Sequence, residues 1–437
     1  MSWLDFFQTT QTLKHTFGRG INASIAPDEE KLFIESSDAF EKKEILEAYA
    51  LFFESLVNYT DDNANDNITY HRIDDTLKFT IYQGCAKLTG IITKECLNAE
   101  VIIVKKKDAN VALKRYILER NYQLTYAYYF TDDEYIKLKL YQDNITMSPQ
   151  KIFFPLREIA LNADFDKEYI KNEFPTLFLE DTSHVNKLDI QESKIKYDFL
   201  QIWIIEAEEK IKILPSNDNA PMQAFILLHL LFKIDYLLVP KYIIVQKLSK
   251  SILEYFTQDN TNIESKNEEI KEYIESLQKI PFEEFEQSFY DANYTFNPTE
   301  KSSYDDIIGF INESLTKIRW YKKNRYNQII PTIYKYIAFY TLYNYGLNPA
   351  LRGLFHLLVE VQNPEFFKKL EYKPLYDIST QIFLKKEILL KIDTIISNYQ
   401  EHYKSLETFS QDLNFSSMNE FSNSFYLEIQ NLNFEEI

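Results

Sequence analysis

The densest group of side chains suited to binding lies in residues 317–326, where basic and aromatic residues alternate. Helical spacing would place four of them on one face: Arg319, Lys322, Lys323 and Tyr326. Arg325 adds a further cation at the end of the segment. Such a face suits single-stranded nucleic acid, because cations contact the phosphates and aromatic rings stack on the bases. It would equally pair with carboxylates of this chain or of an acidic partner, so the segment supports both interpretations.

A metal site is the second chemistry to consider. His356 and Glu360 are four residues apart, which places two potential ligands on one helix face. No third ligand lies nearby and the surrounding segment is apolar, so we interpret His356, like His229, as a histidine at the edge of a core. Cys85 and Cys96 are too few for a four-ligand zinc site or a disulfide framework. The sequence therefore predicts no metal and no cofactor.

Catalytic chemistry has little support in the sequence. Carboxylates occur in pairs, such as Glu283 with Glu284, but a chain with 66 acidic residues contains such pairs by chance. The nucleophile-elbow and zinc-protease motifs do not occur. The chain has only 7 glycines, whereas phosphate-binding loops use glycine for close backbone approach. We expect no catalytic residues and a protein that is not an enzyme.

The charge balance restricts the partners further. The 48 basic and 66 acidic residues give a net charge of −18, which disfavours nucleic acid and anionic membranes. The most apolar segment, 224–245, is long enough to span a bilayer, but Lys233, Asp235 and Pro240 interrupt it. We predict a buried core helix that ends before Pro240 and no membrane contact. The first residues lack a basic segment followed by an apolar one, so we expect a cytoplasmic protein.

The secondary structure predicted to position these residues is mixed helix and strand in the first part of the chain and helical in the remainder. Residues 28–58 have apolar spacings of three and four, which predict one helix. Alternating β-branched segments then predict strands at 68–73, 77–82, 88–93, 100–105, 124–130 and 135–141. A helix is predicted between them at 110–121, and Ser148 with Pro149 predicts the start of another. Beyond residue 194 the spacing predicts only helices, including 281–291 and 377–404.

These elements predict an α+β fold in three segments. The predicted segments are an α+β domain with an antiparallel sheet flanked by helices (1–175), a linker (176–193) and a large all-helical domain (194–437). We expect strands to be confined to about residues 65–145. The polar segment 258–271 is the predicted flexible loop of the helical half.

The strand predicted at 124–130 carries aromatic residues on both faces. Alternation places Tyr126, Tyr128 and Phe130 on one face, and Ala127 and Tyr129 on the other. A solvent-facing strand face is normally polar, so an aromatic face needs a cover. Our first hypothesis is that the helical half of the same chain covers it. The other is that a protein client or a second copy of the chain binds there, through this face or through a free strand edge.

The order of elements in residues 28–175 resembles that of the YbjN family and of the structurally similar type III secretion chaperones. The closest local match is LKRYILERNYQLTYAYYFTDDEYIKLKL, residues 113–140, in which a helix, an aromatic strand, an Asp-Asp hairpin tip and another strand follow one another. Five downstream residues are similar to the closing helix of that family and its exit: Leu156, Glu158, Ile159, Ala163 and Asp164. The resemblance covers about a third of the chain. The long helical half is a departure from it, since secretion chaperones are usually short.

This resemblance implies a small α+β module that binds proteins, often as a dimer or pseudo-dimer, and that has no catalytic residues. We therefore predict a non-enzymatic protein-binding protein, a chaperone or adaptor for a client protein, with self-association as a further possibility. The alternative is an accessory protein that binds nucleic acid through residues 317–326.

Overall fold

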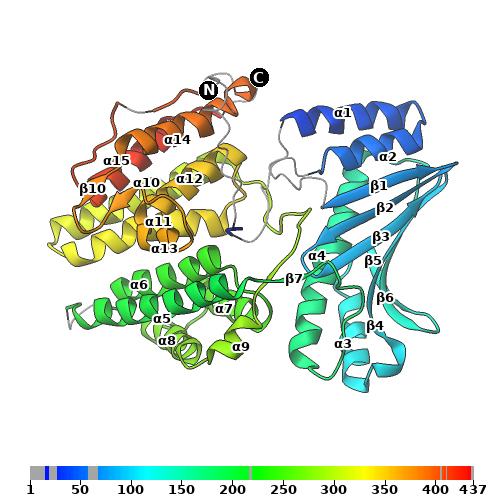
Figure 1. The fold of residues 1–437 in the computed structure, drawn as a ribbon, viewed down its shortest axis with the longest axis horizontal. Coiled ribbons are helices and arrows are strands. Elements are labelled where there is room, and N and C mark those ends of the chain that lie inside the picture. Colours follow the sequence, from blue (N-terminus) through cyan, green and yellow to red (C-terminus); the bar gives the residue numbers. More distant parts are fainter. Residues whose placement is uncertain are drawn as a thin grey trace, which may run out of the picture. The chain divides into compact units, whose positions relative to one another are not determined.

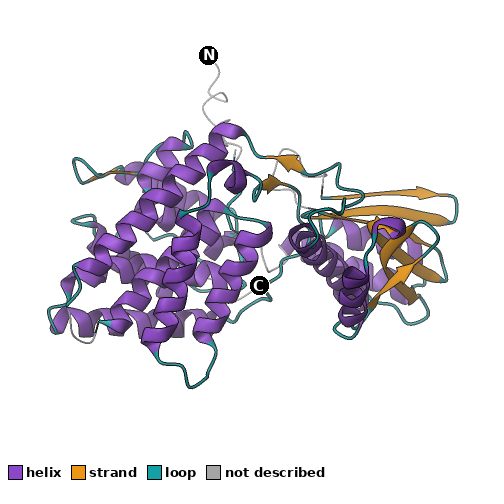
Figure 2. Ribbon diagram, turned by 90° about the horizontal axis from the view of Figure 1, so that it is seen from below, coloured by secondary structure: helices purple, strands orange, loops and turns teal. Residues whose placement is uncertain are grey.

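The structure, a computed structural model, describes residues 15–18, 27–57, 67–215, 219–403, 406–409 and 411–434. These residues belong to two compact units. The first, which we call the sheet unit, holds the residues up to Lys187 together with Tyr290–Pro298. The second, the helical unit, holds Leu188–Phe289 and the residues from Thr299 onward. Figures 1 and 2 show the large sheet in the first unit and mostly helices in the second, so the predicted α+β fold is confirmed.

The sheet unit contains a six-stranded antiparallel sheet with the order β1-β2-β3-β4-β6-β5. Its strands are β1 (Ile68–Ile73), β2 (Thr76–Gln83), β3 (Ala86–Ile92), β4 (Cys96–Lys105), β5 (Ala127–Thr131) and β6 (Tyr135–Asp143). Each coincides with a predicted strand, although β4 begins earlier and β5 later than the alternation indicates. Strands β1 and β5 form the two edges.

Helices pack on one face of this sheet. They are α2 (Ile45–Glu54), α3 (Val111–Asn121) and α4 (Pro149–Glu173), and α1 (Pro27–Glu41) packs on α2 and α4. Helix α4 contacts β2 to β6 and lies behind the strands in Figure 1. It begins as predicted, because the Ser148 hydroxyl accepts a hydrogen bond from the Lys151 N–H at 3.4 Å. Alternate strand side chains, including Leu77, Ile81 and Leu88, are buried toward these helices and form the core.

The single helix predicted at 28–58 is wrong, because α1 and α2 are separate. Lys43 has a left-handed backbone with a φ of 61°. Its N–H donates to Phe40 O at 3.0 Å, and the Glu44 N–H donates to Ala39 O at 2.9 Å. These two bonds end α1 in a Schellman motif, which usually has glycine at the left-handed position. Lysine stands there instead, so the sequence carries no sign of the break.

A segment from the second half of the chain is part of the sheet unit. We call Tyr290–Pro298 the return segment. The Gln83 side chain accepts two backbone hydrogen bonds through Oε1, from Thr295 at 3.1 Å and from Phe296 at 2.7 Å. The Phe296 ring is buried in the core of the sheet unit, 5.6 Å from the centre of the Phe153 ring. The return segment is therefore a structural part of the sheet unit.

The helix predicted at 281–291 is wrong over its second half. Helix α9 (Phe282–Glu286) ends early. The chain then forms β8 (Tyr290–Asp291), which pairs with β7 (Asn186–Lys187). Pairing with a segment a hundred residues away overrides the local helical spacing, because tertiary contacts outweigh weak intrinsic preference.

The unit boundaries differ from the three predicted segments. Residues 176–187, predicted as linker, pack on the sheet unit. There the Glu180 N–H donates to Ile103 O at 3.0 Å, and the ammonium of the buried Lys167 donates to Glu180 O at 2.8 Å. Helix α5 (Ile190–Lys212) begins before residue 194, because the Asp189 carboxylate accepts hydrogen bonds from two N–H groups of its first turn.

The helical unit consists almost entirely of helices. Besides α5 and α9 they are α6 (Ala220–Lys233), α7 (Tyr242–Phe256), α8 (Ile263–Gln278), α10 (Tyr304–Lys323), α11 (Ile330–Asn344), α12 (Pro349–Gln362), α13 (Pro364–Lys369), α14 (Lys385–Ser397) and α15 (Met418–Asn431), with short turns η4 (Ile234–Leu238), η5 (Asn327–Ile329) and η6 (Gln400–His402). Two predictions need correction. The predicted loop 258–271 becomes helical from Ile263, because Asn262 caps α8. The helix predicted at 377–404 is shorter, since β9 (Tyr376–Asp377) pairs with β10 (Ile382–Phe383) before α14 begins.

The most apolar helix is a core element. Helix α6 continues into the π-helical turn η4, and together they are long and apolar enough to cross a membrane. A share of 83% of the apolar stretch within this span is buried inside the protein. It ends at Val239, whose φ of 54° breaks the helix before Pro240. The predicted core helix and its end are confirmed.

Candidate functional site

The face of the sheet opposite α4 carries exposed side chains, and we call it the open face. One cross-strand row runs through Tyr128, Lys139, Glu100 and Thr89, on β5, β6, β4 and β3. The aromatic side chains predicted for this side lie at its β5 end. Tyr126 is 43%, Tyr128 45% and Phe130 41% exposed, whereas Ala127 and Tyr129 are buried. Tyr141 and Ile91 add further exposed apolar area. The open face therefore combines aromatic surface with charged groups.

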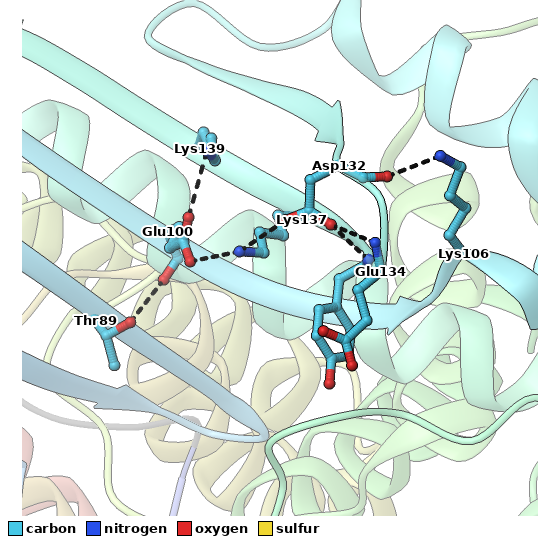
Figure 3. Close-up of polar contacts among 8 residues, drawn as sticks. Thr89, Glu100, Lys106, Asp132, Glu134, Lys137 and Lys139 are labelled. Carbon is cyan, nitrogen blue, oxygen red and sulfur yellow. Dashed lines mark hydrogen bonds and ion pairs between the residues drawn. The ribbon is translucent and has the colours of Figure 1, made fainter.

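The charged groups of the open face form a connected network (Figure 3). Glu100 accepts a hydrogen bond from Lys137 at 2.8 Å and pairs with Lys139 at 3.5 Å. Lys137 also pairs with Asp132 at 3.1 Å. The hydrogen bond that the Lys137 ammonium donates to Glu100 is the main cause that raises the pKa of Lys137. Because these groups are partly exposed, such pairs contribute only about 0–1 kcal/mol each to stability, so their main effect is to fix the lysine side chains in place.

Two further contacts order this network. The ammonium of Lys139 lies 4.3 Å from the centre of the Phe130 ring, within reach of a cation–π attraction. At the β5–β6 hairpin, the Asp132 carboxylate accepts hydrogen bonds from the N–H groups of Tyr135 at 2.7 Å and Glu134 at 2.8 Å. These backbone bonds are the main cause that lowers the pKa of Asp132. The aromatic row and the ion pairs therefore form one ordered surface.

The outer edge of β5 is closed by side chains of the same unit. Glu158 of α4 accepts hydrogen bonds from the N–H groups of Thr125, Tyr126 and Ala127 at 2.7–2.9 Å. Asn121 at the end of α3 accepts one from the Tyr129 N–H at 2.7 Å. Edge strands with free backbone groups are templates for adding another strand, and proteins often cover them. At the beginning of β5, the backbone N–H groups that an added strand would need already donate to Glu158 and Asn121.

The buried side of β5 is anchored by a carboxylate. Asp166 of α4 is fully buried and accepts hydrogen bonds from Tyr129 and Tyr116, both at 2.6 Å. It also pairs with the Arg120 guanidinium at 2.8 Å. Burial, and then the charge of Asp166, raise the pKa of Tyr129 well above its ordinary value, so this phenol remains a donor. The network ties β5, α3 and α4 together beneath the open face.

A cavity opens beside Tyr126. It has a volume of about 390 Å³ and lies where β6 leads into the first turns of α4. Its apolar wall includes Tyr126, Met147, Phe154 and Pro155, and Lys151 and Asp143 supply polar groups. This volume lies within the range of sites that bind small ligands. It is also large enough to receive a side chain of a polypeptide bound across the open face.

The basic and aromatic residues of 317–326 do not share one helix face. Helix α10 ends at Lys323, and Arg325 has a left-handed φ of 64°, so Tyr326 lies beyond the helix. The ring of Tyr326 instead stacks on that of Trp320, with centres 6.2 Å apart. The four cations predicted as contacts are exposed: Arg319, Lys322, Lys323 and Arg325. The exposed cations of residues 319–325 therefore lie close in sequence to the stacked rings of Trp320 and Tyr326.

We expect no measurable binding of single-stranded DNA or RNA by these residues near physiological salt. The net charge of −18 opposes it, and phosphate contacts weaken steeply as salt rises. Fluorescence polarisation with a labelled oligonucleotide measures this directly. Micromolar binding would contradict the prediction if it disappeared when the four exposed cations were replaced by glutamate.

His356 and Glu360, the residues considered as a metal-ligand pair, are engaged in other contacts. Nδ1 of His356 lies 2.9 Å from the Tyr236 hydroxyl, and Glu360 pairs with Lys391 at 2.7 Å. Burial is the main cause that lowers the pKa of His356 to about 3. Within the described part of the chain, no group of three or more His, Cys, Asp or Glu side chains is arranged to hold a metal.

Comparison with known proteins supplies no relative. No protein-family model matches the chain, and no curated protein matches it either. The resemblance to the YbjN family and the secretion chaperones stays a prediction from the order of elements.

Proposed function

We propose that this chain is a non-enzymatic protein-binding protein, a chaperone or adaptor, and that the open face of its sheet contacts a client polypeptide. The observation that carries the proposal is the row Tyr126, Tyr128 and Phe130, exposed on a sheet face where polar side chains would be expected. Tyrosine suits such a surface, since it adds a large contact area and keeps a polar tip.

The geometry favours the open face over the β5 edge as the place of contact. Strand addition depends on main-chain hydrogen bonds from a free edge. Glu158 and Asn121 occupy the N–H groups at the start of β5. The open face offers aromatic area and the fixed ammonium groups of Lys137 and Lys139. The cavity beside Tyr126, whose wall is partly formed by α4, adjoins its aromatic row. A client segment with apolar side chains and some acidic groups would match these features.

The double substitution Tyr126→Ala and Tyr128→Ala tests the proposal. Both side chains are exposed, so we expect the melting temperature to change by less than about 2 °C. Client proteins that co-purify with the wild-type chain from its native host, identified by mass spectrometry, should be lost or strongly reduced. Size-exclusion chromatography of the purified protein shows whether a second copy of the chain is the partner instead.

Tyr122→Ala is the matched control, because Tyr122 is 94% exposed and follows α3 rather than lying on the open face. It should leave both the melting temperature and the recovered proteins unchanged. A clear drop in melting temperature in the double variant alone, with the co-purified proteins retained, would support the other hypothesis, coverage by the helical half. If neither quantity moves, the open face is not the binding site.

A further inference from the structure

The outward face of α3 combines apolar and basic side chains, although the solvent-facing side of a helix is normally polar. Val111 is 67% and Leu118 is 63% exposed. Lys114 and Arg115 lie between them in the sequence and are exposed as well. The spacing i, i+3, i+4, i+7 places all four on one side of the helix, whereas Leu113 on the other side is buried. We call these four exposed residues the basic stripe.

Neither cation of the basic stripe forms an ion pair with any residue that the structure describes. They differ in this from Lys137 and Lys139 of the open face, whose charges are compensated by Glu100 and Asp132. The chain as a whole carries a net charge of −18, so uncompensated cations go against its balance. Exposed apolar patches rimmed by polar groups often mark protein interaction sites. The basic stripe therefore fits a partner surface that combines carboxylates with apolar side chains.

Helix α5 of the helical unit presents a stripe with the same spacing and the opposite charge. Its four side chains, which we call the acidic stripe, are exposed: Ile202, Ile205, Glu206 and Glu209. Ile202 is 45% and Ile205 is 47% exposed. Neither acid is in an ion pair within the described part of the chain, although Glu206 also interacts electrostatically with Lys233 and Lys335. The acidic stripe thus has the chemistry that the basic stripe requires.

We propose that the basic stripe of one copy of this chain binds the acidic stripe of a second copy. Opposite charges favour the encounter and fix the register, and the contact would bury the exposed apolar side chains of both helices. Equal spacing lets the side chains of one helix pack between those of the other. The stripes belong to different units, so the contact is heterologous, and it either closes into a ring or adds further copies as the concentration rises. It lies outside the open face and goes beyond the binding of a client.

Sedimentation velocity of the full chain over a range of concentrations tests this contact. Two short stripes form less than a standard protein–protein interface, so we expect a dissociation constant on the order of 10–100 µM. Salt screens exposed charges, so raising its concentration from about 0.05 to 0.5 M should weaken the association several-fold.

Charge reversal on either stripe should weaken the association by about tenfold or more, because like charges then face each other. On α3 the variant is Lys114→Glu with Arg115→Glu. On α5 it is Glu206→Lys with Glu209→Lys. If the α5 variant does not fold, because Glu206 also interacts with lysines of its own unit, Glu209→Lys alone takes its place.

Mixing the two charge-reversed variants is the specific test of the pairing. Each variant then offers the other a stripe of opposite charge, so an equimolar mixture should associate about as strongly as the wild type. The matched control is Lys322→Glu with Lys323→Glu, which makes the same change of charge at two exposed lysines of α10. This control should associate like the wild type.

Three results would overturn the proposal. The first is a wild-type chain that remains monomeric at every concentration. The second is association that survives both charge reversals. The third is a mixture of the two folded variants that remains monomeric. The variant Tyr126→Ala with Tyr128→Ala should associate like the wild type, so that a failure of the open face and a failure of the stripes are distinguishable. If it is monomeric instead, the second copy binds at the open face and not through α3 and α5.

Discussion

Replacing Phe296 by alanine is expected to lower the free energy of unfolding of the sheet unit by about 3–5 kcal/mol. Phe296 lies far along the chain from the strands, yet its ring fills the core of that unit beside Phe153. Truncating it removes buried apolar contact and leaves a cavity. Hydrogen exchange of the full chain, read at the amides of β2 and β3, is the suitable measurement, because two units need not unfold together.

Phe178→Ala is the control for this substitution, since Phe178 belongs to the same unit and is 82% exposed. It should change stability by about 0.5 kcal/mol or less. Gln83→Ala gives an independent result. It leaves the N–H groups of Thr295 and Phe296 without their acceptor, at about 1–3 kcal/mol for each group. Equal protection in Phe296→Ala and Phe178→Ala would show that the return segment does not stabilise the sheet.

The packing of the return segment on the sheet unit could not be predicted from the sequence, whereas the strands could. The six strands could be predicted because alternation is a local property, visible within five to ten residues. The contact between Gln83 and Phe296 joins positions more than two hundred residues apart, and residues 292–298 have no period that would indicate a strand or a helix. A fragment cut at residue 193, inside the predicted linker, would lack Phe296 and expose the core that it fills.

The candidate site likewise has features that the sequence could predict and features that depend on tertiary packing. Alternation correctly places Tyr128 and Tyr129 on opposite faces, because it depends only on neighbouring residues. The closure of the β5 edge by Glu158 and Asn121 depends on how α4 and α3 pack, which no local pattern records.

Asp166→Ala is expected to destabilise the sheet unit by about 3–5 kcal/mol, because removing one partner leaves the other charge buried and unpaired. The Arg120 guanidinium would lose its carboxylate, and the phenols of Tyr116 and Tyr129 would lose their acceptor. The loss should concentrate at β5, where Tyr129 is the anchored residue. Faster hydrogen exchange at the amides of β5 than at those of β2 is the specific sign of this mechanism.

Lys87→Met is the control for Asp166→Ala, since it breaks the partly exposed pair of Lys87 with Asp181 and should cost about 0–1 kcal/mol. Adding Arg120→Met to Asp166→Ala should recover part of the lost stability, because the uncompensated charge is then removed. A double variant that is less stable than Asp166→Ala alone would assign the loss to the phenol hydrogen bonds and to packing. If Asp166→Ala and Lys87→Met are equally stable, Asp166 does not hold β5 in place. In that case the order of the aromatic row on the open face must come from the Glu158 contacts instead.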